Sequence, residues 1–363
     1  MHASDICSDW LTNTLHSAGV LPSAVAVTDI ETRPIGTGQV ADSFQIHADY
    51  SDVTTCPASF VAKISSDAEL SRAAGRTELN YLREVRFYQE IAEQLPVRVP
   101  LCYHGEIDSN NTEFVLLLED LSPARQGDQL KDSSLDEVEL AVREAARIHA
   151  PFWGSEELVG NPWLDISASY WARFTEMIPQ WWAGFIERYR DRLGPDDIAL
   201  GTLFSDNIEG YYRALRTIPF TVQHGDFRPD NVLFEAGGGS VEIAVLDWQT
   251  VLFAPGPVDV AYFIGGALDP DSRRVHEPEL LARYHRELVA NGVSGYSLAD
   301  LERDYPIGTF QNFVIGVAAA MLVARSDRGD NLFLSMVTRS LDHARAHDAM
   351  NRIVSVGGEV EYV

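Results

Sequence analysis

Residues 222–234 read VQHGDFRPDNVLF and place Asp226 and Asn231 in a short polar segment between two apolar ends. A further carboxylate, Asp247, ends the apolar stretch VEIAVLD that follows. A loop of this kind can present one carboxylate to an incoming hydroxyl group. At its far end an amide oxygen, together with the second carboxylate from the neighbouring strand, supplies the oxygen ligands that Mg²⁺ prefers. The spacing therefore predicts a catalytic base, Asp226, beside a magnesium site at Asn231 and Asp247.

The segment admits three other interpretations: a surface loop, His224 as the base, and a metallohydrolase site. A tight surface loop is one, because Pro229 and Asp230 are good turn residues and Asp or Asn often bonds its own backbone, but such a loop leaves Asp247 unexplained. His224 suits a hydrogen-bonding strut better than a base. A metallohydrolase that uses His224 as a ligand would need a second His at ligand spacing, which the adjacent sequence lacks.

The pattern His-x-Asp-x₄-Asn followed by a strand-ending Asp resembles the catalytic loop and metal-binding Asp of the eukaryotic-like kinase superfamily. The form HGDFRPDN, with DWQ at residues 247–249 where protein kinases carry DFG, resembles the aminoglycoside phosphotransferase and ecdysteroid/choline kinase-like families. This resemblance implies that Asp226 is the catalytic base, that Asn231 and Asp247 bind Mg²⁺, and that His224 supports the loop.

The chain changes character near residue 120. Before it, short apolar segments bounded by turn residues predict strands at 23–30, 40–47, 59–64 and 113–118, and apolar residues at three- and four-residue spacing predict one helix at 77–95. After it, long helical patterns dominate at 134–149, 167–192 and 308–325, with a short β pair at 218–234 and 241–247. We expect an α+β fold with a small β-rich N-lobe (1–120) and a larger, mainly helical C-lobe (121–363). The resemblance implies that this fold is bilobed and protein-kinase-like, and that the N-lobe binds the nucleotide on an antiparallel sheet.

Lys63 lies in the apolar strand FVAKI, which resembles the Val-Ala-Ile-Lys strand of kinases. A single ammonium inside an apolar strand requires a carboxylate partner unless it points to solvent from an edge strand. Glu78 and Glu84 both fall near the apolar face of the predicted helix 77–95, and periodicity does not choose between them. The resemblance favours Glu84 as the partner and implies that Lys63 binds the nucleotide phosphates.

Other nucleotide contacts are expected from the segment PIGTGQVADSF, between two predicted strands. Gly36, Gly38 and Ser43 there could donate hydrogen bonds to phosphate, although the segment lacks the full GxGxxG pattern and an ordinary hairpin turn explains it equally well. The segment FVLLLEDL resembles the hinge strand of the same families, so backbone groups from Glu119 to Leu121 are expected at the purine edge. Backbone recognition leaves ATP and GTP undistinguished.

Two further residues in the second half resemble family positions. His149 is interpreted as a packing residue, and Asp259 resembles an Asp that braces the catalytic loop, a role that is compatible with capping its own helix. Trp residues also gather in this half and could line an acceptor pocket or form an aromatic core between helices. The candidates for the pocket are Trp153, Trp171, Trp181 and Trp182.

Composition limits the partners. The chain has 363 residues and a formal net charge of -26, which disfavours nucleic acid and anionic membrane surfaces. Because no apolar run reaches the length of a membrane span and the first residues do not resemble a signal peptide, we expect a cytoplasmic protein. The resulting hypothesis is a kinase that transfers phosphate from ATP or GTP, with Mg²⁺, to a hydroxyl group of a small molecule. A kinase-like binding protein without turnover and, less well supported, a protein kinase are the alternatives.

Overall fold

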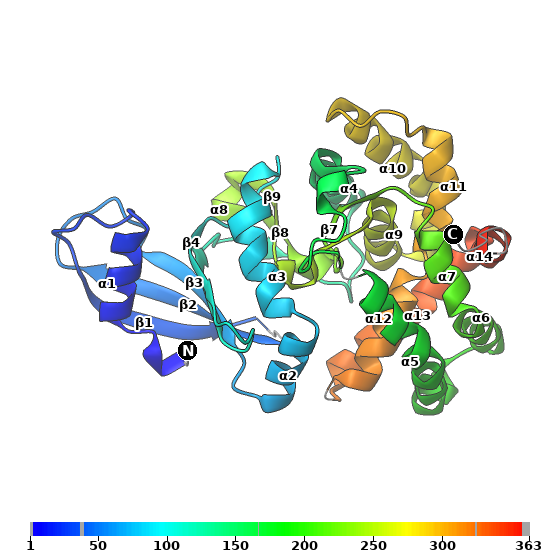
Figure 1. Cartoon of the computed structure of the whole chain (residues 1–363), viewed down its shortest axis with the longest axis horizontal. Helices are drawn as coiled ribbons and strands as arrows, with labels where there is room; N and C mark the ends of the chain where they lie inside the picture. Colours follow the sequence, from blue (N-terminus) through cyan, green and yellow to red (C-terminus); the bar gives the residue numbers. More distant parts are fainter. Residues whose placement is uncertain (1–2, 37–39, 166, 324, 358–363) are drawn as a thin grey trace. The chain divides into compact units, whose positions relative to one another are not determined.

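The computed structural model describes residues 3–36, 40–165, 167–323 and 325–357. It divides into two compact units, the first formed by Met1–Arg125 and Glu235–Val251 and the second by Gln126–Phe234 and Leu252–Val363. The chain passes from one unit to the other in the short strands β6 (Arg125–Gln126) and β8 (Val232–Glu235), and again after Val251. Residues 235–251, which a simple division at residue 120 assigns to the helical part, group here with the first unit (Figure 1).

The first unit is built on a five-stranded antiparallel sheet with the order β1-β2-β3-β5-β4. Its strands are β1 (Val27–Ile35), β2 (Ala41–Tyr50), β3 (Ser59–Ser65), β4 (Cys102–Ile107) and β5 (Phe114–Glu119). The sequence analysis predicted four of these strands and missed β4, which is partly exposed along its length and has a Gly at its centre.

Side chains of β3 alternate between the two faces of this sheet, as in any strand. Phe60, Ala62 and Ile64 are buried in an apolar cluster with Leu11 and Leu15 of helix α1 (Ser8–Ser17). The residues between them point to the opposite face, where α3 (Asn80–Arg86) packs against β4 and β5. This alternation directs Lys63 away from the apolar cluster and toward α3.

The predicted helix at 77–95 is not one regular helix. Helix α2 (Glu69–Thr77) ends before it, and α3 begins after Leu79, whose φ is 57°. From Phe87 to Ile91 the helix widens into a π-turn, and a 3₁₀ turn follows at Ala92–Gln94. The π-turn allows two consecutive aromatic residues, Phe87 and Tyr88, to be buried together, which the regular 3.6-residue period does not favour.

The second unit is mainly helical. Its helices are α4 (Leu135–His149), α5 (Ser167–Tyr189), α6 (Pro195–Asp206), α7 (Ile208–Leu215), α9 (Gly256–Ala267), α10 (Pro270–Ala290), α11 (Leu298–Gly308), α12 (Gln311–Leu322), α13 (Asp327–Ala346) and α14 (Ala349–Gly357). The predicted helices at 134–149, 167–192 and 308–325 correspond to α4, to α5 with a following 3₁₀ turn, and to α12. The start of α4 follows from its sequence, because Ser134 and Glu137 form a capping box.

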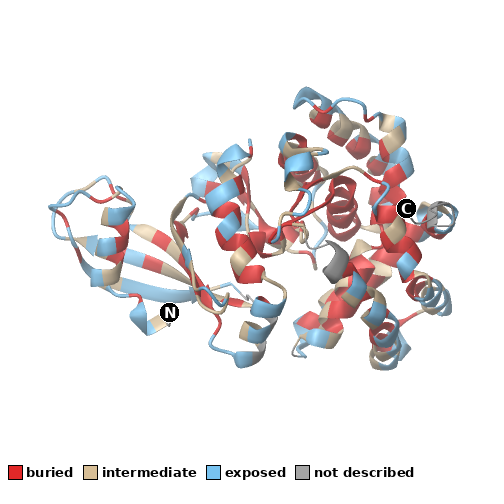
Figure 2. Cartoon of the chain, viewed as in Figure 1, coloured by how far each residue is buried: buried red, intermediate tan, exposed pale blue. Residues whose placement is uncertain are grey.

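A large apolar core joins residues of α5, α6, α7, α9 and α11 to α14. Every residue of α9 is buried (Figure 2). The segment Leu298–Leu322 is apolar and long enough to cross a membrane by length and composition alone. However, 72% of its apolar window is buried inside the protein, so these side chains pack in the core.

Two short strands and one helix of the second unit position its functional loop. Strand β7 (Phe220–Gln223) pairs antiparallel with β10 (Leu252–Pro255), and Gln223 Nε2 donates to Pro255 O at 3.1 Å. The HGDFRPDN segment begins directly after β7, and α9 begins directly after β10. In this antiparallel register Pro255 is opposite Phe220, so α9 begins beside the start of β7, and it is Asp259, the fourth residue of α9, that meets the first residue of the loop, His224.

Candidate nucleotide and catalytic site

Lys63 of the first unit lies between two carboxylates. Its Nζ donates to Glu84 Oε1 and to Asp247 Oδ1, both at 2.8 Å, and the residue is only 8% exposed. Of the two candidate partners on the predicted helix, Glu84 makes the pair, whereas Glu78 lies in the turn between α2 and α3. Three residues singled out from separate parts of the sequence are thus in direct contact.

Burial and neighbouring charges together determine the pKa values of Lys63 and Glu84. Burial disfavours the ammonium of Lys63, but the carboxylates of Asp247 and Glu84 more than offset this and raise its pKa, so it remains charged. Burial raises the pKa of Glu84 to about 7, although Lys63 opposes the shift. The Asp247 side chain is 41% exposed and keeps contact with solvent. One buried cation is therefore held by one buried and one solvent-facing carboxylate.

Asp247 follows strand β9 (Val241–Val245) in a left-handed backbone conformation, with φ 63° and ψ 67°. This conformation is uncommon for a residue other than glycine and costs of order 1 kcal/mol or more. Its neighbours hold it in place: the ring of Trp248 stacks on Phe87 with centroids 3.9 Å apart, and Asn80 Nδ2 donates to Gln249 O at 3.0 Å. Such maintained strain is typical of functional positions.

Several polar groups of the predicted hinge, residues 119–121, form hydrogen bonds within the first unit. Both carboxylate oxygens of Glu119 accept from Arg98 Nη2 at 2.6 Å, and the N–H of Glu119 donates to Leu101 O. The carbonyl of Leu121 accepts from Gly237 N. Among the described residues, no hydrogen-bond partner is seen for the backbone N–H of Asp120 or of Leu121.

The predicted phosphate-covering segment is only partly described. Gly36 has a φ of +72°, a conformation that favours glycine, at the end of β1. Gly38 lies outside the described residues. Ser43 is directly opposite Lys63 in the β2–β3 register, so its side chain is on the same face of the sheet as the ammonium.

In the second unit, three donors fix the carboxylate of Asp226. Tyr262 OH donates to Oδ1 at 2.8 Å, while Arg228 Nε and Asn231 Nδ2 donate to Oδ2 at 3.0 and 2.8 Å. The side chain is 24% exposed, so the carboxylate is oriented by the protein and still open to solvent. This is the arrangement expected of a positioned base.

Asn231 is 5% exposed, and its amide nitrogen donates to both the backbone carbonyl and the carboxylate of Asp226, each at 2.8 Å. Because the amide nitrogen of Asn231 already donates these two hydrogen bonds, the oxygen Oδ1 is the atom with which this side chain can bind a ligand. Asn231 and Asp247 both carry oxygen donors of the kind that Mg²⁺ binds, and their residue types fit that ion.

Asp259 binds the start of the loop. Its Oδ2 accepts from the backbone N–H of His224 at 2.7 Å and its Oδ1 from that of Gly225 at 3.1 Å, while the residue itself is 1% exposed. His149 contributes from α4, with Nε2 3.3 Å from Asp259 Oδ2 and Nδ1 2.7 Å from Tyr284 OH. The bracing geometry expected of Asp259 is present, and fully buried His149 is a packing residue. His224 is also fully buried, and its Nδ1 accepts from Asp226 N at 3.3 Å.

Two residues beside Asp226 were missed in the sequence analysis. Tyr262 lies three residues after Asp259 on α9, so the i,i+3 spacing of a helix placed it on the same side. Arg228 bridges Asp226 and Asp230, with an N–O distance of 3.0 Å to each. Burial disfavours its guanidinium, but these carboxylates together with Tyr262 raise its pKa, so it stays charged.

The predicted aromatic wall is largely interior. Trp171, Trp181 and Trp182 are 5%, 8% and 2% exposed and belong to the main apolar core of the second unit. A ring that binds a ligand has to be accessible. Trp171, Trp181 and Trp182 therefore form part of an aromatic core between helices, which was the alternative prediction. Trp153 is partly exposed and tilts against Tyr296, with ring centroids 4.9 Å apart.

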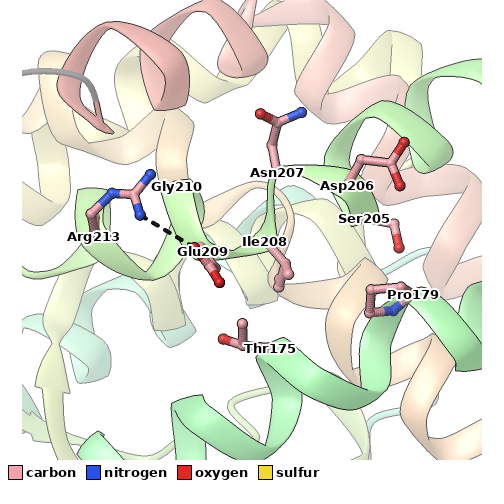
Figure 3. Close-up of a pocket in the computed structure, with 9 residues that line it drawn as sticks. All are labelled: Thr175, Pro179, Ser205, Asp206, Asn207, Ile208, Glu209, Gly210 and Arg213. Atoms are coloured by element: carbon pink, nitrogen blue, oxygen red, sulfur yellow. Dashed lines mark ion pairs between the residues drawn. The ribbon is translucent and has the colours of Figure 1, made fainter.

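A pocket of about 350 Å³ lies in the second unit, and residues of α5, α6 and α7 line it (Figure 3). Its walls carry Asp206, Glu209 and Arg213, and none of the four Trp candidates lines it. Arg213 forms an ion pair with Glu209, 3.7 Å apart, at its rim. The pocket is polar and does not resemble the aromatic acceptor site expected from sequence.

Residues 32–295 match the model of the phosphotransferase enzyme family (APH). Among curated proteins, no sequence matches the chain. Solved structures with a similar fold include choline kinase from Cryptosporidium parvum (TM-score 0.54, 9% identity, covering 95% of this chain and 97% of that one). They also include Plasmodium vivax ethanolamine kinase (0.51, 12%, 86% and 82%) and the GDP complex of aminoglycoside 2'-phosphotransferase-IIIa (0.50, 14%, 92% and 99%). These likenesses confirm the predicted kinase-like fold.

Proposed function

Because the chain belongs to the phosphotransferase enzyme family, we propose that it is a small-molecule kinase that transfers the γ-phosphoryl group of ATP or GTP to a hydroxyl group of a small organic molecule. The observation that carries the proposal is the buried ammonium of Lys63, held at 2.8 Å from both Glu84 and Asp247. Apolar residues of similar volume would often be at least as stable in place of a buried group of paired charges, so such a group suggests a functional role. Binding a polyphosphate is the role that fits the family.

In this mechanism Lys63 binds the α- and β-phosphates, and Glu84 keeps its ammonium in place. Asn231 and Asp247 are the residues that would hold Mg²⁺ through their side-chain oxygens, and the ion when bound neutralises charge on the phosphates. The strained backbone at Asp247 is consistent with a ligand position.

Asp226 orients the acceptor hydroxyl and accepts its proton as the new P–O bond forms. Tyr262, Arg228 and Asn231 fix its carboxylate, so little reorganisation is required during the reaction. The carboxylate of Asp259 holds the start of the loop by accepting hydrogen bonds from the backbone N–H groups of His224 and Gly225. The catalytic power of such a site comes from placement and charge, with no covalent enzyme intermediate.

The acceptor is a small hydroxylated molecule. Two of the similar structures are named for amino alcohols and one for aminoglycosides, so a search begins with these classes. The acidic chain, with its net charge of -26, favours a cationic acceptor over an anionic one.

The test has two steps. The first measures thermal stability with ATP or GTP, each with and without Mg²⁺. The second incubates the protein with the better nucleotide and a panel of amino alcohols, aminoglycosides, sugars, sterols and macrolides, and follows phosphate transfer by ³¹P NMR and mass spectrometry.

We expect Mg²⁺-dependent stabilisation by one nucleotide and a phosphorylated product with at least one alcohol. Stabilisation by the nucleotide without any product across the panel would favour the kinase-like binding protein. Neither stabilisation nor product would refute the proposal.

A further inference from the structure

Three potential metal ligands meet in the second unit, outside the loop that carries Asp226. They are Glu277 of α10, His343 of α13 and His347, the residue that ends α13. Glu277 Oε1 is 2.6 Å from His343 Nε2, and Glu277 Oε2 is 2.8 Å from His347 Nε2. One ligand atom from each of the three lies within 4.8 Å of the others, and we call these residues the Glu277 cluster.

The geometry of the Glu277 cluster suits a tetrahedral ion. His343 lies in the last turn of α13 and His347 directly follows the helix, and both present Nε2 to the same carboxylate. Two imidazoles and one carboxylate form a common zinc ligand set, with a fourth position left for water. Ligand atoms on a tetrahedral zinc ion lie about 3.3 Å apart, given bonds of about 2.0 to 2.1 Å. The contacts of 2.6 and 2.8 Å would therefore have to widen by well under about 1 Å, and the widest separation among the ligand atoms, within 4.8 Å, would have to shorten by up to about 1.5 Å; side-chain torsions allow both changes.

The surroundings complete the site. Tyr305 OH donates to Glu277 Oε1 at 2.7 Å, the kind of contact that orients a ligating carboxylate. Glu277 is 5% exposed and His343 fully buried, whereas the His347 side chain is 24% exposed and gives access from solvent. A Cβ at Gly265 of α9 would lie 2.6 Å from His343 Nδ1, so the absence of a side chain there makes room for the imidazole.

Arg273, a buried cation close enough to His343 to interact with it electrostatically, is paired with Asp342 at 2.8 Å.

We propose that Glu277, His343 and His347 form a binding site for one zinc-class divalent cation. The nitrogen ligands select Zn²⁺ over Mg²⁺, which prefers oxygen, so this site is distinct in chemistry from the one at Asn231 and Asp247. The bound ion ties α10 to the end of α13 and stabilises the second unit. The competing explanation is a hydrogen-bonded network in which the three residues satisfy one another without a metal.

The experiment titrates Zn²⁺ into chelator-treated full-length protein, followed by calorimetry and thermal unfolding. The variant His347→Ala removes the partly exposed ligand, and His276→Ala, which deletes an imidazole outside the cluster on α10, is the matched control. Asp247→Asn reports any zinc bound at the proposed magnesium ligands. Co²⁺ replaces Zn²⁺ in a parallel titration, because its visible absorption distinguishes tetrahedral nitrogen and oxygen coordination from an octahedral aquo ion.

We expect one zinc ion per chain in the wild type, in His276→Ala and in Asp247→Asn. At free zinc about 100 times Kd, the melting temperature of the wild type should rise by several degrees. His347→Ala should bind at least about 100-fold more weakly. Tyr305→Phe, which removes the hydroxyl that contacts Glu277 Oε1 and His343 Nε2, should bind about 10-fold to 100-fold more weakly.

Equal zinc affinity in the wild type and His347→Ala would overturn the proposal, as would the lack of saturable one-to-one binding. If His347→Ala does not fold, as judged by circular dichroism, Tyr305→Phe decides the outcome. A zinc site lost only in Asp247→Asn would place the ion at the proposed magnesium ligands and would also refute the inference.

Discussion

The contact between Asp259 and the start of the HGDFRPDN loop gives a prediction whose size follows from the structure. Asp259 accepts from two backbone N–H groups, those of His224 and Gly225, and is itself 1% exposed. In Asp259→Asn the single remaining oxygen can keep one of these bonds, and the new NH₂ group faces the other N–H. In Asp259→Ala both N–H groups lose their acceptor.

A buried donor without a partner costs about 1 to 3 kcal/mol. We therefore expect the free energy of local loop opening to fall by about 1 to 3 kcal/mol in Asp259→Asn and by about 2 to 6 kcal/mol in Asp259→Ala. At 1.36 kcal/mol for each factor of ten, amide exchange should accelerate at least about 5-fold in the first variant and about 30-fold in the second.

Hydrogen–deuterium exchange of peptides that span residues 220–231 measures this effect, and turnover is measured on the same samples. Asp304→Asn is the matched control, because Asp304 is also a buried aspartate of the second unit, 2% exposed, but contacts Tyr296 and Arg303 instead of the loop. Exchange in Asp259→Ala no faster than in this control would refute the bracing role of Asp259.

Three further predictions concern charge. Lys63→Met should weaken binding of the Mg²⁺–nucleotide complex about 10-fold to 100-fold in calorimetry, since it deletes charge-assisted hydrogen bonds, and unchanged affinity would contradict the phosphate-binding role. Because burial raises the pKa of Glu84 to about 7, kcat/KM of the wild type should fall as the pH drops below about 7, when Glu84 takes up a proton and stops holding Lys63. Glu84→Gln should abolish this acid limb, and a limb that persists would assign it to another group. Burial lowers the pKa of His343 from 6.5 to about 4, so its contribution to stability is complete above pH 6.5 and is lost as the pH falls toward 4, by about 3 kcal/mol in total. Urea unfolding in EDTA should show this decline in the wild type and lack it in His343→Gln.

Local patterns carried much of the information about the candidate site. A lone ammonium in an apolar strand required a carboxylate partner, and the apolar face of the following helix offered Glu78 and Glu84; the structure places Glu84 2.8 Å from Lys63. Resemblance to a family was needed to choose Glu84 over Glu78, since the two fell equally near the apolar face. Asp247 was recognised because it ends an apolar strand shortly after Asp226 and Asn231, carries an oxygen ligand that suits Mg²⁺, and resembles the metal-binding Asp of kinases.

The features that were missed depend on packing that no local pattern describes. The π-turn at Phe87–Ile91 follows from the burial of two consecutive aromatic residues, one of them stacked on Trp248. Strand β4 is partly exposed and carries a weak apolar pattern. Whether the Trp residues form a core or line a binding pocket also depended on tertiary structure, because a segment rich in aromatic residues suits either role.

The Glu277 cluster illustrates the same limit over a longer range. The spacing His343-x₃-His347 is visible in the sequence, but Glu277 is 66 residues before His343 and on another helix. Only the packing of α10 against α13 brings the carboxylate to the two imidazoles.

The most direct test of the central claim compares the wild type with Asp226→Asn, using the acceptor identified in the panel. The account predicts that turnover falls by ~10² or more, because a positioned base contributes at least that much, while affinity for the Mg²⁺–nucleotide complex stays within a few fold. Equal turnover in the two proteins would show that Asp226 is not the base and would contradict the proposed function of the loop.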